Sequence, residues 1–285
     1  MPVARTLLLT ALAMLAFAGN SLLCRLALKE TAIDAVSFTA VRIAAGALML
    51  WLLLHLRRQP LAATGNWRAA AALFVYAAAF SYAYLQLDAG AGALLLFGAV
   101  QLCMVVVGLL RGERLNLQQT LGFALATGGL VVLLLPGANA PPLVGGLLML
   151  LSGLAWGAYT LLGRQAGLPL AATAGNFIRA LPFAALLLLP FLGELRCDLS
   201  GLIYALLSGA LTSGIGYAIW YSALPGLGAL QAASVQLSVP VIAALGGTLL
   251  LGEHISLRLV LVSAAVLGGI ALVLRAKFQP VPERA

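Results

Sequence analysis

The sequence predicts an all-α polytopic membrane protein with ten transmembrane helices, arranged as two inverted five-helix repeats. The first observation is composition, because 63% of the 285 residues are hydrophobic and only 8% are charged. In soluble domains about a quarter of the residues are charged. The second observation is a series of apolar runs, each long enough to cross a bilayer. The third is a similarity between the two halves of the chain.

The apolar runs are each about 20 residues long, the length a helix needs to span roughly 30 Å of hydrocarbon. Only helices and closed barrels satisfy the backbone in lipid, and the runs show no alternation of apolar and polar residues. We therefore expect helices over residues 6–27, 36–56, 67–87, 89–110, 117–136, 143–163, 171–192, 201–222, 226–250 and 256–275. The connections between them are short, so no soluble domain is expected.

The positive charges predict the orientation. With the N-terminus in the cytoplasm, ten Lys and Arg residues at or beyond the ends of the spans lie on the inner side and four on the outer side. The four outer residues are Arg25, Lys29, Arg196 and Arg258. Because positive charge favours the cytoplasmic side, we expect a multi-pass protein of the cell (inner) membrane. Both termini, including a short tail at 276–285, are then cytoplasmic.

The two halves, residues 1–136 and 143–275, align when the chain is shifted by about 136 to 140 positions. The matched positions are Arg25 with Arg164, Arg42 with Arg179, Gln101 with Gln236, Gly112-Glu113 with Gly252-Glu253, and Gly128-Gly129 with Gly268-Gly269. Five spans is an odd number, so the second copy enters the membrane from the opposite side. In transporters such repeats place a substrate site between the halves near the midplane, although a channel or a scaffold could share the arrangement.

Several features together resemble one family. They are five plus five spans, a Gly-Glu pair closing the fourth and ninth spans, Pro240 in the ninth, and Gly-Tyr-Ala-Ile-Trp-Tyr at 216–221. The chain is similar over essentially its whole length to EamA-type members of the drug/metabolite transporter superfamily. That resemblance implies a transporter, and members of known activity export amino acids and related small metabolites, among them an aromatic amino acid exporter. The fourth span lacks a proline matching Pro240.

Polar and aromatic side chains recur at helical spacing on six spans, which is typical of one helix face. These candidate cavity residues are Phe17, Asn20, Tyr76, Phe80, Phe97, Gln101, Trp156, Tyr159, Tyr217, Trp220, Gln231, Ser234, Gln236 and Ser238. Ordinary packing or an interfacial belt would also explain the aromatics. For Asn20, Gln101 and Gln236, hydrogen bonding between helices is an equal alternative to lining a cavity.

Arg42 and Arg179 are the charged residues that fall clearly inside spans. Each is a possible carboxylate-binding group, or it extends to the nearer interface or bonds a helix-end carbonyl. We expect Glu113 and Glu253 to complement the positive end of the helix that follows each of them. Pro240 removes a backbone donor and is expected to bend its helix as a hinge. The pairs Gly108/Gly112 and Gly153/Gly157 have a spacing that predicts close helix packing within the bundle.

Several classes of function are not expected. The spans carry no Asp, Glu or His at mid-depth, which disfavours proton coupling through a buried carboxylate and favours a facilitator or exchanger. No P-loop, HExxH or Gly-x-Ser-x-Gly motif is present, so neither catalysis nor a cofactor is expected. The three cysteines lack metal-ligand spacing, and the basic residues form no patch for nucleic acid.

The sequence therefore predicts a secondary transporter that exports small amphipathic metabolites, with apolar or aromatic amino acids as the leading expectation, by alternating access around a central cavity. The expected partners are a small-molecule substrate and the lipid bilayer, with monomer and homodimer both open. The alternatives are a cationic drug or multidrug efflux transporter and a non-transporting membrane scaffold.

Overall fold

The computed structural model describes residues 3–58, 65–112, 114–137, 139–163, 168–227 and 229–275, and within these ranges it is helical without extended strands. The α-helices are α1 (Val3–Glu30), α2 (Ala35–Leu56), α3 (Trp67–Tyr84), α4 (Ala89–Leu110), α5 (Leu117–Leu134), α6 (Leu143–Gly163), α7 (Pro169–Leu188), α8 (Leu199–Leu206), α9 (Gly216–Ala223), α10 (Ala229–Val235), α11 (Ser238–Leu251) and α12 (Leu257–Arg275). A π-helix, η2 (Leu207–Ile215), joins α8 to α9, and short 3-10 turns lie at η1 (Leu189–Phe191) and η3 (Leu224–Gly226).

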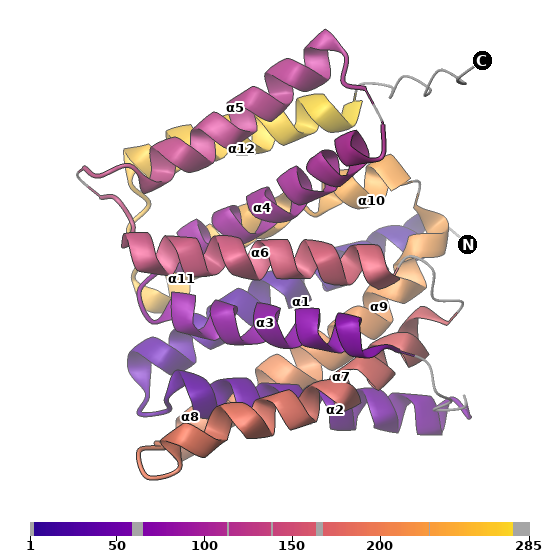
Figure 1. Ribbon diagram of the computed structural model, residues 1–285, viewed down its shortest axis with the longest axis vertical. Coiled ribbons are helices and arrows are strands. Elements are labelled where there is room, and N and C mark those ends of the chain that lie inside the picture. The colour runs from indigo at the N-terminus through magenta and orange to yellow at the C-terminus, as the bar shows by residue number, and fades with distance from the viewer. Residues whose placement is uncertain are drawn as a thin grey trace.

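Each of the ten predicted segments is helical, and together they form one bundle (Figure 1). Eight helical stretches among the described residues are long and apolar enough to cross a membrane. The two exceptions are α3, with 18 residues, and the segment 229–251, which is divided into α10 and α11. The protein is therefore a multi-pass membrane protein.

The helices run side by side, with α5 and α12 paired along one edge of the bundle and α2 and α8 near the other (Figure 1). Between these edges α6 packs against both α3 and α4. Helix α1 contacts η2, α9, α11, α3 and α4, so it lies at the centre. The start of α1 and the end of α12 lie at the same end of the bundle, as an even number of crossings requires.

The Gly153/Gly157 pair packs α6 closely onto α4, as its spacing predicts. A Cβ added at Gly153 would lie 2.6 Å from the carbonyl oxygen of Leu96, and one at Gly157 would lie 3.0 Å from the sulfur of Cys103. Neither backbone could approach so closely with a larger residue. These glycines therefore serve contacts inside the bundle.

The ninth predicted span is not the continuous bent helix expected over 226–250. It ends at Val235, makes a turn at Gln236-Leu237 and restarts at Ser238. Pro240 explains the position of the break, because a proline lacks the N–H that would bond the carbonyl of Gln236 and its ring clashes there. The N–H of Val239 bonds that carbonyl instead, at 3.1 Å. Pro240 thus lies in the first turn of a new helix, where proline is tolerated.

Gly252 ends α11 in the left-handed conformation, with φ of 62°. Its N–H bonds the carbonyl of Gly247, which satisfies one of the carbonyls left free at the end of the helix. A glycine carries no steric penalty in this conformation. The chain therefore reverses sharply here, and Glu253 is turned back toward the bundle.

Candidate functional site

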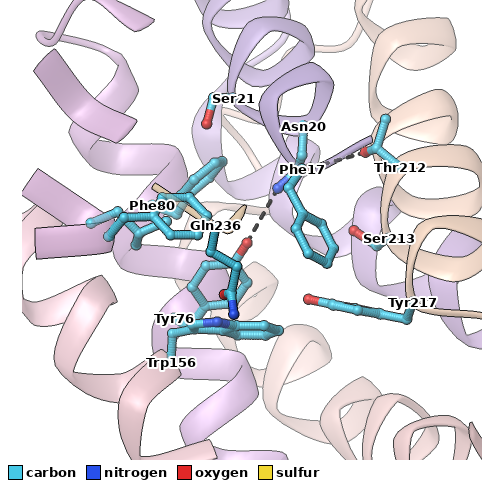
Figure 2. Close-up of a pocket in the computed structure, with 12 residues that line it drawn as sticks. Phe17, Asn20, Ser21, Tyr76, Phe80, Trp156, Thr212, Ser213, Tyr217 and Gln236 are labelled. Atoms are coloured by element: carbon cyan, nitrogen blue, oxygen red, sulfur yellow. Dashed lines mark hydrogen bonds between the residues drawn. The ribbon is translucent and has the colours of Figure 1, made fainter. Parts of the chain in front are cut away.

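A pocket lies at the centre of the bundle, enclosed by α1, α3, α4, α6, η2 and α9 and by the turn at Gln236 (Figure 2). It holds about 420 Å³ of space between atoms, including the space at its mouth. The lining residues are Phe17, Asn20, Ser21, Tyr76, Phe80, Leu96, Phe97, Trp156, Thr212, Ser213, Tyr217 and Gln236. Eight of the fourteen candidate cavity residues are in this set.

Aromatic rings form one wall of the pocket. Trp156 stacks on Tyr217 with ring centroids 5.5 Å apart and an angle of 16° between the planes. Tyr76 approaches Trp156 from α3 at 4.8 Å, and Phe17 approaches Tyr217 from α1 at 5.9 Å. Rings at these separations favour one another beyond the area they bury. The wall offers flat apolar faces to a bound molecule.

A hydrogen-bonded network built around Asn20 forms the opposing polar side. The Asn20 amide nitrogen donates to the Tyr76 hydroxyl at 3.2 Å, and its oxygen accepts from Thr212 at 3.3 Å (Figure 2). The same oxygen accepts from Ser208 at 2.7 Å. Asn20 therefore links α1 to α3 and to η2 while also lining the pocket. The two alternatives for this residue, lining a cavity and hydrogen bonding between helices, therefore apply at the same time.

The π-helix η2 brings Thr212 and Ser213 to the pocket. Short π segments inside α-helices occur frequently at functional sites. Gly209 lets η2 lie directly on α2, since an added Cβ would overlap the carbonyl oxygen of Arg42. The helical spacing did not identify Ser21, Leu96 or Thr212; the available signal was the run of Ser, Thr and Gly in an otherwise apolar span, typical of close helix contacts.

Arg42 is not among the lining residues, but it packs on the rings of Tyr76 and Phe80, which are, and it is 2% exposed. Its Nη2 donates to the Tyr76 hydroxyl at 2.8 Å, and its Cζ lies 4.7 Å from the centroid of the Phe80 ring. Its repeat-related partner, Arg179, is half-buried and donates from Nη1 to the carbonyl of Gly175 in its own helix, at 3.1 Å. The two arginines therefore have different environments.

Comparison with known proteins decides the family. The EamA-like transporter family matches residues 4–135 and again residues 143–275. The chain belongs to the EamA-like transporter family. An uncharacterized protein of Pseudomonas aeruginosa is 74% identical over 275 residues, covering 96% of each chain. A solved crystal structure with 19% identity has a TM-score of 0.67 over 96% of this chain and 98% of that one, which shows a shared fold. The family is one of membrane transporters in the drug/metabolite transporter superfamily.

The remaining candidates of this EamA-family transporter lie outside the pocket. Tyr159 stacks on Trp156 from behind, at 5.1 Å, and Trp220 packs on Phe17 at 6.0 Å. Four candidates have other positions: Gln101 is buried on α4, Gln231 and Ser234 are exposed on α10, and Ser238 bonds the carbonyl of Val235. The break at Gln236 explains why Gln231 and Ser234 do not line the pocket, because the helix face that was expected to carry them there is interrupted.

A second polar cluster lies at the end of the bundle away from the start of α1. The buried Arg25 donates to Glu253 at 3.1 Å, to Asp88 at 3.3 Å and to the carbonyl of Tyr84 at 2.9 Å. The other carboxylate oxygen of Glu253 accepts the Ala89 N–H at 2.8 Å. The expectation that Glu253 complements the following helix is therefore wrong: the turn at Gly252 directs it to the N-terminus of α4 instead. Glu113 and Arg164 lie outside the described residues.

Glu253 lies between α11 and α12, and burial raises the pKa of its carboxyl group above the ordinary value. The bonds from Ala89 and Arg25 act in the opposite direction but are outweighed. Burial therefore lowers the cost of neutralising this carboxyl group. Within the described part of the chain, no three His, Cys, Asp or Glu side chains come together as metal ligands.

Proposed function

We propose that this EamA-family protein is a secondary transporter that exports small amphipathic metabolites, with apolar or aromatic amino acids as the leading substrates. One observation carries the proposal: a central pocket combines the stacked rings of Trp156 and Tyr217 with the neutral polar groups of Asn20, Thr212 and Gln236. Apolar walls with a few placed polar groups suit a ligand that has an apolar body and a polar head.

The mechanism we propose is alternating access between two inverted repeats. The two family matches, 4–135 and 143–275, each contain five helical segments, an odd number. The first repeat supplies seven of the twelve lining residues and the second supplies five. A site between the repeats is the arrangement that rocking of one repeat against the other requires. The break before Pro240 is the proposed hinge for one end of the bundle.

The proposed orientation, with both termini in the cytoplasm of a cell with an inner membrane, rests on the bias of Lys and Arg. It places the cluster of Arg25, Asp88 and Glu253 at the outer end. The cluster joins α1, the α3–α4 turn and the α11–α12 turn. We propose that it holds this end closed and separates when the pocket opens outward.

The proposed energy coupling is facilitation or exchange. Among the described residues no Asp, Glu or His lines the pocket. Proton coupling through a carboxylate in the cavity therefore has no residue to carry the proton. Export then follows the gradient of the solute itself, as in facilitation, or is driven by the inward movement of a second solute, as in exchange. Flux that collapses when only the pH gradient is removed would contradict this part of the proposal.

The test is transport by the purified full chain in proteoliposomes. Each of the twenty amino acids is presented under both gradient and exchange conditions, with protein-free liposomes as the blank. We expect saturable flux of at least one apolar or aromatic amino acid. Absence of flux for all twenty under both conditions would refute the transport proposal in this form.

Site variants connect the flux to the pocket. Gln236→Ala removes a polar group at the turn and should lower the affinity for substrate, because the amide is one of the few polar groups facing the pocket. Ser234→Ala, on the exposed side of α10, is the matched control and should transport normally. Equal kinetics for the two variants would remove Gln236 from the site.

A further inference from the structure

We infer that the pocket receives a solute bearing a carboxylate, held by the Tyr76 hydroxyl with the Arg42 guanidinium behind it. The inference rests on the proposed transport function and names the substrate class for it. Arg42 projects from α2, and its Cζ lies 5.1 Å from the ring centroid of Tyr76 and 4.7 Å from that of Phe80. Both rings line the pocket, so the positive charge lies directly behind one wall.

The charge of Arg42 has no countercharge among the described residues. The ion pairs in the described part of the chain involve other bases: Asp88 and Glu253 pair with Arg25, and Glu30 pairs with Lys29. A buried guanidinium is costly unless it is paired and hydrogen-bonded. The faces of Tyr76 and Phe80 offset part of that cost through cation–π attraction. An anion entering the pocket would offset more of it.

The hydrogen-bonding capacity of Arg42 is also incompletely used. Its Nη2 donates to Tyr76, while the buried Nη1 has no hydrogen-bond partner. Buried polar groups in folded proteins are nearly always bonded. A buried donor without a partner next to a cavity is the feature expected where a bound solute supplies the acceptor.

The Tyr76 hydroxyl connects this donor to the pocket. It accepts from Arg42 at 2.8 Å and from Asn20 at 3.2 Å, which occupies both of its acceptor positions. Ser208 fixes the Asn20 amide by donating to its oxygen at 2.7 Å. The Tyr76 proton must therefore be donated elsewhere, and no described protein group accepts it. Two donors pointing at one oxygen make that O–H a stronger donor, for which a carboxylate is the best acceptor.

The other features of the pocket restrict the class of solute. No acidic side chain among the described residues lines it, so an organic cation without a carboxylate finds no countercharge. The Trp156 and Tyr217 rings accept an apolar body. The expected substrates are small monocarboxylates with an apolar side chain, including apolar α-amino acids, and simple amines are excluded.

The test compares four solutes of one shape in proteoliposomes carrying the full chain: phenylalanine, 3-phenylpropionate, phenylalaninamide and phenethylamine. We expect the two carboxylates to be carried roughly tenfold to hundredfold better than the amide and the amine, the range expected for hydrogen bonds to a charged group. This comparison uses the unmodified protein, so it does not depend on a variant that folds.

Variants then assign the preference to Arg42. Arg42→Gln should abolish the discrimination, and Arg42→Lys should keep it with weaker affinity, because lysine retains the charge without the planar fork. The matched control is Arg179→Gln at the repeat-related position, where the guanidinium is bonded to its own helix. Gel-filtration profiles of the variants confirm that each is folded.

The outcomes separate the inference from the proposed function. If the amide and the amine are carried as well as the acids, the carboxylate inference is overturned while transport stands. If Arg179→Gln, and not Arg42→Gln, loses the discrimination, the assignment to Arg42 is overturned. No flux of these four solutes or of the twenty amino acids would overturn the proposed function, and the inference with it.

Discussion

Replacement of Glu253 by Ala should release the end of the bundle that the Arg25 cluster closes. The variant removes the acceptors of two buried donors, the Arg25 Nε–H at 3.1 Å and the Ala89 N–H at 2.8 Å. Each donor left without a partner costs about 1–3 kcal/mol, so the closed arrangement loses about 2–6 kcal/mol. The lower figure already corresponds to roughly a thirtyfold shift toward states in which the cluster has separated.

Cys24 is the natural reporter of this opening. It is fully buried on α1, directly before Arg25 and one turn after Asn20 of the pocket. In a protein carrying Cys103→Ala and Cys197→Ser, a membrane-impermeant maleimide can react at that cysteine alone. We expect Glu253→Ala to raise the labelling rate by at least about tenfold when the reagent is added to the outer side.

Two further variants make the measurement decisive. Glu253→Gln keeps one oxygen acceptor, and since burial raises the pKa of this carboxyl, loss of its charge costs less. Its labelling rate should fall between those of the parent protein and Glu253→Ala. Glu194→Ala, an exposed acid on the α7–α8 connection, should label as slowly as the parent. A parental labelling rate in Glu253→Ala, with unchanged thermal stability, would refute the role of the cluster.

Three other variants test the site and the packing around it. Trp156→Ala should lower kcat/KM for an aromatic substrate by roughly tenfold, since a stacked ring pair is worth about 0.5–1.5 kcal/mol beyond its buried area; Leu154→Ala, at an exposed position of the same helix, should not. Pro240→Ala restores the missing N–H and should slow turnover roughly twofold to tenfold, as one backbone bond predicts, with KM little changed; full turnover would reduce the break to packing. Gly209→Ala should destabilise the fold by about 1–3 kcal/mol, because the added Cβ overlaps the α2 backbone, and the measurement is a lower Tm. Gly128→Ala is the control and should not lower the Tm in this way, because its added Cβ meets open space.

The positions of the helices follow from the sequence because the bilayer sets one length for every span. Apolar runs begin and end within a few residues of the observed helices, as in the fourth segment, predicted and observed at 89–110. The break lies at Gln236-Leu237 and not at Pro240 itself, because a proline leaves the carbonyl four residues earlier without its helical hydrogen bond. The π-helix η2 was not expected from the sequence, in which the same stretch belongs to one apolar run, and Gly209 within it packs directly on α2.

The site was predictable to the extent that its helices are regular. Spacing along α1 and α3 identified Phe17, Asn20, Tyr76 and Phe80, all of which line the pocket. The same rule applied across the break placed exposed α10 residues in the candidate set, because helical spacing holds only while the helix continues. The partners of Arg25 could not be predicted from the sequence: Asp88 is 63 positions away and Glu253 is 228, and no local pattern encodes such contacts.

Residues at matched positions of the two repeats have different surroundings, and this difference bears on how the transporter works. Gln101 and Gln236 occupy matched positions, yet α4 passes through Gln101 without interruption and buries it, while the chain breaks at Gln236 and turns it into the pocket. Arg42 and Arg179 differ in the same way, one with an orphaned donor beside the pocket and one bonded to its own helix. Exchange of conformations between perfectly equivalent repeats would give both members of each pair the same role in turn. A broken α10–α11 and a continuous α4 cannot exchange in this way, because only one of them contains a proline. The two ends of the bundle are therefore expected to open by different motions, with the α10–α11 turn as a local hinge and α4 moving as a rigid helix.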